Sequence, residues 1–191
     1  METKNIMIVG VGGQGSLLAS KLLGQLLMAQ GYDVKVSEVH GMSQRGGSVV
    51  TYVRISNDKP LYSSIVEQGQ ADVVLAFENL EALRALPYMK EGGTMVINTQ
   101  EILPMPVITG AVEYPADCLE RTRKACKTVE INAVEIAHEC GTYKAANVVL
   151  MGVLAKSLPF SEEEWKKAIT ACVKPKFLDV NLMAFERGFN Y

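Results

Sequence analysis

The sequence predicts a three-layer α/β domain in which a mostly parallel sheet is flanked by helices on both faces. Short apolar runs alternate with amphipathic helical stretches along the whole chain, which is the pattern of strands joined by helical crossovers. The first run leads into IMIVGVGGQGS at 6–16, a glycine-rich turn between a strand and a helix that is typical of Rossmann-like folds. Because 191 residues bury one good core but are short for two, we expect residues 1–191 to form a single domain.

The composition narrows the possible classes of function. Hydrophobic residues make up 48% of the chain, charged residues 21%, and the formal net charge is -2, so we expect no nucleic-acid partner and no membrane binding. Polar residues interrupt the apolar runs well before the roughly 18 residues needed to span a bilayer. Only METKN precedes the first strand-like run, which argues against a secretory signal and predicts a cytoplasmic protein.

The N-terminal elements form a strand, a helix and a second strand. Residues 4–9 read as a buried strand that ends in glycine, and 32–39 alternate in polarity as a strand does. The helix between them ends at Gly31, a favourable residue at that position. Its apolar stripe consists of Leu17, Leu18, Leu22, Leu23, Leu26 and Leu27. The unit implies a right-handed parallel crossover.

The remaining elements continue the alternation. Further strands are predicted at 49–56, 71–77, 91–98, 111–114 and 127–132. Further helices are predicted at 78–89, 116–126, 133–141, 143–158, 161–173 and 175–191. Ser161 and Glu164 have the spacing of a capping box at the start of the fifth of these helices. Residues 102–110, with two prolines, are expected to form a loop or a distorted edge segment.

The glycine turn is a candidate binding site for a nucleotide or a phosphate. Gly10 allows a tight exit from the strand, Gly12 and Gly13 remove side chains where a phosphate could approach, and Gly15 lets the helix pack on the strand. Free N–H groups at the start of the helix would face the anion. Glu38 lies near the position of an acid that binds ribose. The alternative is that the glycines serve only close packing and loop geometry.

The four cysteines indicate free thiols in a reducing compartment. Cys118, Cys126, Cys140 and Cys172 contain no Cys-x-x-Cys pair, the close spacing that zinc and iron–sulfur sites normally use. We therefore expect this chain alone to hold no metal and no cluster. The thiols are expected to be buried or half-buried.

A second glycine-containing loop, HGMSQRGGS at 40–48, is more specific than the first. Together with GVGGQG, the segment at 71–98 and NVVLMGVLA at 147–155, it resembles the gamma subunits or domains of 2-oxoacid:ferredoxin oxidoreductases over essentially the whole chain. The sequence of this loop is most similar to that found in the indolepyruvate branch of the family, in which the corresponding chain is the beta subunit. The resemblance implies a subunit of an enzyme that decarboxylates indolepyruvate or another 2-oxoacid, transfers the acyl group to coenzyme A and passes electrons to ferredoxin.

The same resemblance places the redox and decarboxylation cofactors on a larger catalytic partner subunit. These cofactors are thiamine diphosphate, magnesium and iron–sulfur clusters. The present sequence shows neither cluster-ligand spacing nor a convincing thiamine-diphosphate motif of Gly-Asp-Gly followed by a paired Asn. We expect the isolated chain to be inactive and to expose an apolar face through which it could form a homodimer. Two other functions stay open: a free-standing Rossmann protein that binds NAD or FAD, and a non-catalytic assembly module.

Arg45 is the candidate anion-binding cation of the second loop. Gly46 and Gly47 permit close backbone approach, while Ser43, Gln44 and Ser48 supply neutral hydrogen bonds. Given the resemblance, coenzyme A is the preferred ligand and the substrate carboxylate the second. The alternative is a structural arginine that binds backbone carbonyls or an acid of the partner subunit. The full candidate set is Gly10, Gly12, Gly13, Gln14, Gly15, Ser43, Gln44, Arg45, Gly46 and Gly47. Asn147 is expected to cap or bind near the glycine turn.

Overall fold

The computed structural model describes residues 3–41 and 46–191, and it contains one six-stranded sheet with the strand order β2-β3-β1-β4-β5-β6. The strands are β1 (Lys4–Val11), β2 (Asp33–His40), β3 (Ser48–Ser56), β4 (Ala71–Ala76), β5 (Met89–Asn98) and β6 (Lys127–Ile131). β1, β4, β5 and β6 pair in parallel, whereas β3 is antiparallel to both β1 and β2. The predicted mostly parallel sheet is confirmed, and a single reversed strand separates β1 from β2.

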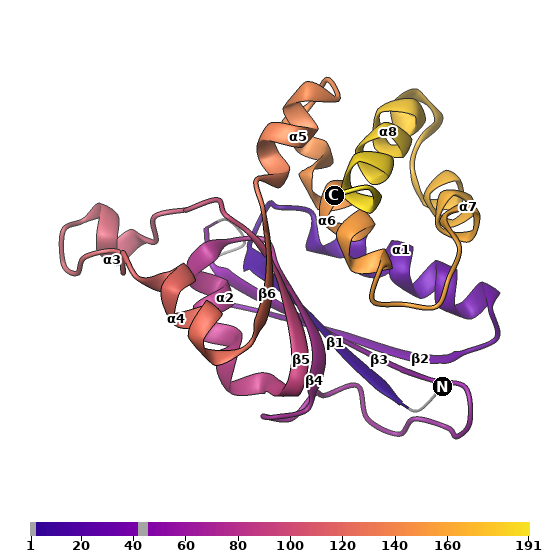
Figure 1. The fold of residues 1–191 in the computed structure, drawn as a ribbon, viewed down its shortest axis with the longest axis horizontal. Coiled ribbons are helices and arrows are strands. Elements are labelled where there is room, and N and C mark those ends of the chain that lie inside the picture. Colours follow the sequence, from indigo (N-terminus) through magenta and orange to yellow (C-terminus); the bar gives the residue numbers. More distant parts are fainter. Residues whose placement is uncertain (1–2, 42–45) are drawn as a thin grey trace.

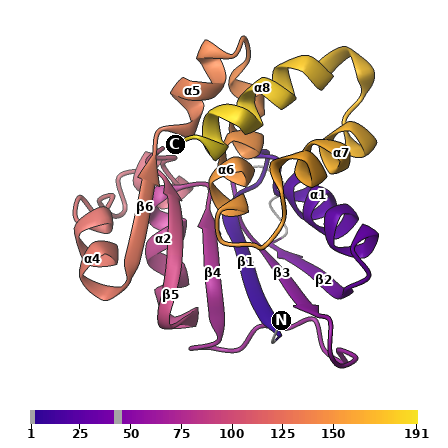
Figure 2. The same cartoon turned by 45° about the vertical axis from the view of Figure 1, so that its right-hand side comes forward.

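Helices cover both faces of this sheet. They are α1 (Ser16–Ala29), α2 (Asn79–Ala85), α3 (Met105–Ile108), α4 (Cys118–Ala125), α5 (Ala133–Glu139), α6 (Ala146–Ala155), α7 (Glu162–Cys172) and α8 (Leu178–Phe189). Short 3₁₀ turns lie at Leu86–Tyr88, Tyr143–Ala145 and Pro175–Phe177. Figures 1 and 2 show α2 and α4 on one face and α1, α6, α7 and α8 on the other. The predicted three-layer arrangement is therefore confirmed.

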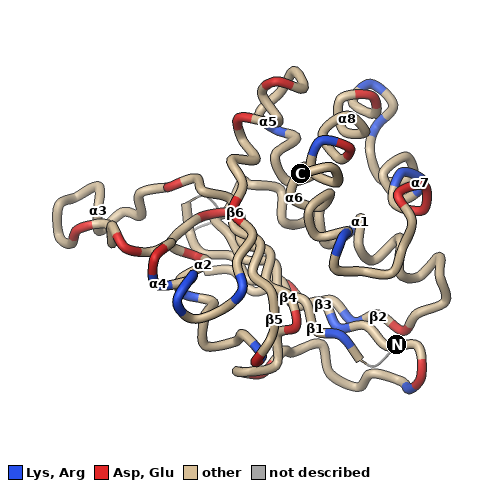
Figure 3. The backbone as a smooth tube through the Cα atoms, viewed as in Figure 1, with Lys and Arg blue, Asp and Glu red and all other residues tan. Residues whose placement is uncertain are grey.

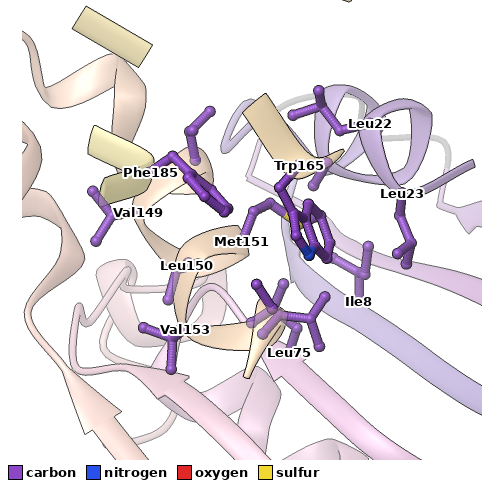
Figure 4. Close-up of a cluster of buried hydrophobic side chains, with 14 of the residues drawn as sticks. Ile8, Leu22, Leu23, Leu75, Val149, Leu150, Met151, Val153, Trp165 and Phe185 are labelled. Atoms are coloured by element: carbon purple, nitrogen blue, oxygen red, sulfur yellow. The ribbon is translucent and has the colours of Figure 1, made fainter. Parts of the chain in front are cut away.

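Alternation along β1 divides the core into two parts. Ile6 and Ile8 belong to the larger cluster, with α1, α6, α7 and α8, while Met7 and Val9 belong to the smaller one under α2. Trp165 anchors the larger cluster, and its ring stacks on Phe185 with the centroids 5.8 Å apart (Figure 4). Because the clusters lie on opposite faces, α1 and α2 leave the carboxyl edge of the sheet in opposite directions.

Close contact between α6 and α8 holds the C-terminal helices on the larger cluster. A Cβ atom added at Gly188 would overlap the carbonyl oxygen of Val149, and one added at Gly152 would lie 2.6 Å from the backbone nitrogen of Phe189. The two backbones approach this closely because glycine stands at both crossing points. α7 begins with the predicted capping box, in which Ser161 and Glu164 bond reciprocally.

Several predicted elements differ from the structure. Residues 102–110, expected to form a loop or a distorted edge segment, contain the short helix α3. Residues 111–114 do not form a strand, because their backbone leaves the sheet and Tyr114 is tied to Glu78 instead. The helix predicted at 78–89 ends at Ala85, where a 3₁₀ turn containing Pro87 follows. β5 consequently begins earlier than predicted and carries Gly92 at a positive φ of 78°. In the described part of the chain, no helix has the length and apolar character to cross a membrane.

Candidate site at the glycine turn

The glycine turn joins β1 to α1 at the carboxyl edge of the sheet, where two of its glycines are required by packing. A Cβ atom at Gly10 would lie 2.9 Å from Cβ of Phe77, at the end of β4. At Gly15, where φ is +86°, an added Cβ would lie 2.5 Å from Nδ2 of Asn147. Gly13 also has a positive φ, of 104°, but open space around it. The packing interpretation thus accounts for Gly10 and Gly15, and Gly13 is free to face a ligand.

Gln14 ties together the ends of three strands. Its Oε1 accepts a hydrogen bond from the Val11 backbone N–H at 2.8 Å, and its Nε2 donates to the Phe77 carbonyl at 2.8 Å and to Oε1 of Gln100 at 3.1 Å. These contacts span the crevice between β1 and β4, where a doubly wound sheet normally binds its ligand because the flanking helices diverge. The side chain of Gln14 is therefore occupied within the chain.

The start of α1 retains unused donors. The backbone N–H groups of Gly15, Ser16 and Leu17 make no hydrogen bond to any residue that the structure describes, and no side chain caps the helix. Three such N–H groups, together with the partial positive charge of a helix N-terminus, favour an anion. The Gly12 N–H is used differently, since it donates to the Gly47 carbonyl at 2.9 Å. This bond fixes the end of the second loop against the glycine turn.

The second loop connects β2 to β3 and is held at its C-terminal end. Ser48 Oγ donates to Oε2 of buried Glu81 at 2.5 Å, and Arg84 donates to the other oxygen of that carboxylate at 2.6 Å. Gly46 has a positive φ of 76°, which favours glycine. Of the candidate residues in this loop, Ser43, Gln44 and Arg45 lie outside the described residues.

Two hollows flank the glycine turn. The one beside α6 has a volume of about 440 Å³, and the one beside β2 about 360 Å³. The first is lined by Gly13, Gln14, Gly15, Phe77, Asn98, Gln100, Val134, Tyr143, Lys144, Ala146, Asn147 and Leu150. The second is lined by Gly12, Gly13, Gly15, Ser16, Leu17, Glu38, His40 and Val49.

The charges of the described lining residues distinguish these hollows. Lys144 is the charged residue of the hollow beside α6, which contains no acid among its described residues. Glu38 lies in the other hollow, where its Oε2 accepts from Thr51 at 3.2 Å and from Ser16 at 3.5 Å. Glu38 thus lies close to the start of α1. A carboxylate there repels a phosphate, whereas Lys144 attracts one.

Sequence reasoning placed Asn147 correctly and missed its neighbours. Asn147 Nδ2 donates to the Gly15 carbonyl at 3.2 Å, so this helix start does contact the glycine turn. Lys144, Asn98 and Gln100 were not predicted as site residues. Asn98 ends β5, Gln100 lies just after it, and Lys144 lies in the 3₁₀ turn before α6. Their proximity to the glycine turn depends on how elements far apart in the sequence pack together.

The cysteines match their predicted environment. Cys118 and Cys140 are buried, Cys126 and Cys172 are half-buried, and none forms a disulfide. Burial raises the pKa of all four thiols, which keeps them protonated and weakly nucleophilic near neutral pH. Across residues 3–41 and 46–191, no three His, Cys, Asp or Glu side chains come together as a metal site would need.

The fold and site define a Rossmann-like α/β domain with an anion-favouring hollow at the carboxyl edge and a hairpin loop tied to its glycine turn. The model of the pyruvate ferredoxin/flavodoxin oxidoreductase family matches residues 5–191, and the chain belongs to this family. It is similar to the indolepyruvate oxidoreductase subunit IorB of Thermococcus kodakarensis, with 44% identity covering 98% of this chain and 95% of the relative. The predicted resemblance, including its indolepyruvate branch, is confirmed.

Solved structures agree with this assignment. The gamma subunit of a keto/oxoacid ferredoxin oxidoreductase from Geobacter sulfurreducens matches with a TM-score of 0.71 and 25% identity, covering 98% of this chain and 96% of that one. A 2-oxoglutarate:ferredoxin oxidoreductase from Magnetococcus marinus, solved with coenzyme A, has the same fold in one part. Its TM-score is 0.68 at 21% identity, and the match covers all of this chain and 31% of that one. The chain is a small, gamma-type subunit of a 2-oxoacid oxidoreductase.

Proposed function

We propose that this subunit serves the oxidative decarboxylation of indolepyruvate, or of a closely related 2-oxoacid, to an acyl-CoA, with ferredoxin as electron acceptor. The near full-length similarity to the Thermococcus kodakarensis indolepyruvate subunit carries this proposal. Thiamine diphosphate, magnesium and iron–sulfur clusters belong to a larger catalytic subunit, and the isolated chain is inactive. The unpaired thiols of this chain suit a reducing compartment, and we place the complex in the cytoplasm.

Within the complex, the contribution of this chain is to hold a phosphate of coenzyme A at the glycine turn. The proposed contacts are the N–H groups at the start of α1, the second loop with Arg45, and Lys144. Three observations support them: the unused donors at Gly15, Ser16 and Leu17, the bond from Gly12 to Gly47, and the hollow with Lys144 as its described charge. Anions bind helix N-termini because N–H groups and dipole both favour them. The substrate carboxylate is the second candidate ligand.

Kinetics of the reconstituted complex test this site. Arg45→Ala and Lys144→Ala, each assembled with the catalytic subunit, are expected to raise the KM for coenzyme A about 10-fold or more, because a hydrogen bond to a charged group contributes roughly 1.5–3 kcal/mol. The matched control is Lys59→Ala, an exposed lysine in the segment after β3 at the opposite edge of the sheet. If the complex forms and neither site variant changes the KM for coenzyme A, the proposed contacts are wrong.

The free-standing dinucleotide enzyme is disfavoured by the hydrogen bonds of Gln14, which hold its side chain across the crevice between β1 and β4, beside the helix start where a pyrophosphate would bind. Calorimetry with NAD should therefore show no saturable binding, and micromolar or tighter binding would support that alternative. A purely structural assembly module predicts that the Arg45 and Lys144 variants assemble normally and keep wild-type kinetics.

A further inference from the structure

An apolar arm projects from the sheet between β5 and α4. Residues 102–112 contain no charged residue, although 21% of the whole chain is charged. Leu103, Met105, Ile108 and Val112 are 48%, 68%, 62% and 56% exposed. Figure 1 shows α3 projecting beyond α4. In Figure 3 the tip of this segment is tan, the colour of residues that are neither basic nor acidic. Such a gathering of exposed apolar side chains marks an interaction site more often than a plain surface does.

The arm has its own backbone hydrogen bonds. The Ile108 N–H donates to the Pro104 carbonyl at 3.1 Å, and the Ala111 N–H donates to the Pro106 carbonyl at 2.8 Å. Thr109 Oγ1 donates to the Met105 carbonyl at 3.0 Å. These bonds form a single helical turn with its apolar side chains held outward. A partner would therefore meet a surface that is already ordered, which lowers the entropy lost on binding.

A buried carboxylate clamps both ends of the arm. Oε1 of Glu78, which is 1% exposed, accepts from the Ile102 N–H at 3.1 Å and from the Tyr114 hydroxyl at 2.6 Å. The Tyr114 oxygen in turn accepts from the Leu80 N–H at 3.1 Å. Burial, followed by the hydrogen bond to Glu78, raises the pKa of Tyr114, so the phenol stays a donor at physiological pH. The arm is thus fixed to the start of α2 at both ends.

The base of the arm is continuous with the glycine turn. Gln100, two residues before the arm, accepts a hydrogen bond from Gln14 at 3.1 Å. The carbonyl of Gln100 also accepts from the Asn79 N–H at 3.0 Å. A molecule bound to the arm therefore lies at the carboxyl edge of the sheet, on the side of the candidate coenzyme A site.

Acidic residues stand at the two ends of the apolar surface. Glu101 and Glu113 are both exposed, and neither has a Lys or Arg partner among the residues described. Apolar side chains at the centre and unpaired charges at the rim are the usual anatomy of a binding patch. The complementary surface is an apolar groove with a basic rim.

We propose that this arm docks into an apolar, basic-rimmed groove on the larger catalytic subunit of the same enzyme. The inference rests on the proposed function, because it takes that subunit as its partner. Docking there brings the carboxyl edge of the sheet, and with it the glycine turn, against the subunit that carries the reaction. A second copy of this chain fits less well, since a symmetric arm-to-arm contact would place Glu101 and Glu113 of both copies together. A standard interface buries about 800 Å² per partner, so the arm anchors one part of that area and its surroundings supply the rest.

Binding to the catalytic subunit tests the proposal. The double variant Met105→Asp/Ile108→Asp of the full chain is expected to bind the catalytic subunit about 100-fold more weakly or worse, because apolar anchors at an interface centre carry most of its affinity. The matched control is Tyr62→Asp, a 94% exposed aromatic in the segment after β3, which should bind like the wild type. Because these side chains are exposed, the variants are expected to fold, and urea unfolding of each isolated chain verifies this.

A second pair of variants tests the acidic rim. Glu101→Lys/Glu113→Lys should slow association several-fold at low salt, and the effect should shrink as salt screens the charges. The proposal is overturned if the folded Met105/Ile108 variant binds the catalytic subunit like the wild type. It is also overturned if that variant only converts a dimer of the isolated chain into a monomer. Failure of the wild-type chain to bind any such catalytic subunit would instead refute the proposed function.

Discussion

Replacing Gln14 with alanine measures how far the crevice between β1 and β4 depends on a single side chain. Three hydrogen bonds are lost, and each contributes roughly 0.5–1.5 kcal/mol net. Two circumstances reduce the sum. The Phe77 carbonyl keeps the bond from Asn98 Nδ2 at 2.9 Å. Gln14 lines the adjoining hollow, so removal of its side chain leaves space through which water can reach the freed Val11 N–H. We therefore expect a loss of about 2 kcal/mol in the free energy of unfolding.

Urea unfolding of the isolated chain at neutral pH is the assay. Gln68→Ala is the matched control, because Gln68 is exposed and surface substitutions usually change stability by less than about 0.5 kcal/mol. Gln14→Glu separates hydrogen bonding from volume: it keeps the acceptor for Val11 but places oxygen against the Phe77 carbonyl and Gln100, so it should cost at least as much as alanine. If both Gln14 variants unfold like the control, the side chain does not hold the strand ends together and the argument against a dinucleotide in this crevice fails.

Two further predictions concern stability. Gly188→Ala should destabilise the chain by about 3 kcal/mol or more and lower its Tm in calorimetry, because the added methyl would overlap the Val149 carbonyl; Gly110→Ala, at an exposed turn with open space, should cost less. The hydrogen bonds from Ser161 lower the pKa of Glu164, so the stabilisation by this capping box is present above the ordinary carboxyl pKa and is lost as pH falls through the lowered value. Ser161→Ala should therefore reduce the difference in stability between neutral pH and pH 3, and an unchanged difference would contradict the capping assignment.

Local patterns in the sequence predict much of this fold. The glycine turn, the leucine stripe of α1 and the capping box of α7 each depend on residues close together in the chain, and all three are present. Leu17 is the exception within the stripe: it is predicted on the apolar face, but it is 68% exposed because it lies in the first turn of α1, away from the core. The strand expected at 111–114 fails because the alternation of AVEY is short, and a buried carboxylate from α2 holds Tyr114 outside the sheet. Local polarity carries no information about that partner.

Part of the candidate site is likewise predictable from local sequence, and part depends on contacts between distant residues. The spacing of the glycines predicts the position of the turn, and the residues of the second loop indicate the family. The contacts of Gln14 and the proximity of Lys144 arise from pairing among β1, β4 and β5, and from α6 crossing beside the turn. The reversal of β3 is equally non-local, because the polarity of its residues fits either direction.

The antiparallel direction of β3 also affects how freely the sequence of the second loop can change without loss of fold stability. Because β2 and β3 form a hairpin, the loop at 41–47 begins and ends on neighbouring strands, with His40 opposite Val49. The free energy of closing such a loop changes by only about 0.6 kcal/mol when its length doubles. We therefore expect substitutions and insertions there to change the surroundings of the glycine turn while the strands and their register stay as they are. Because Gly47 at the end of this loop is bonded to Gly12, a change of loop sequence reaches the candidate site without requiring a compensating change in the core.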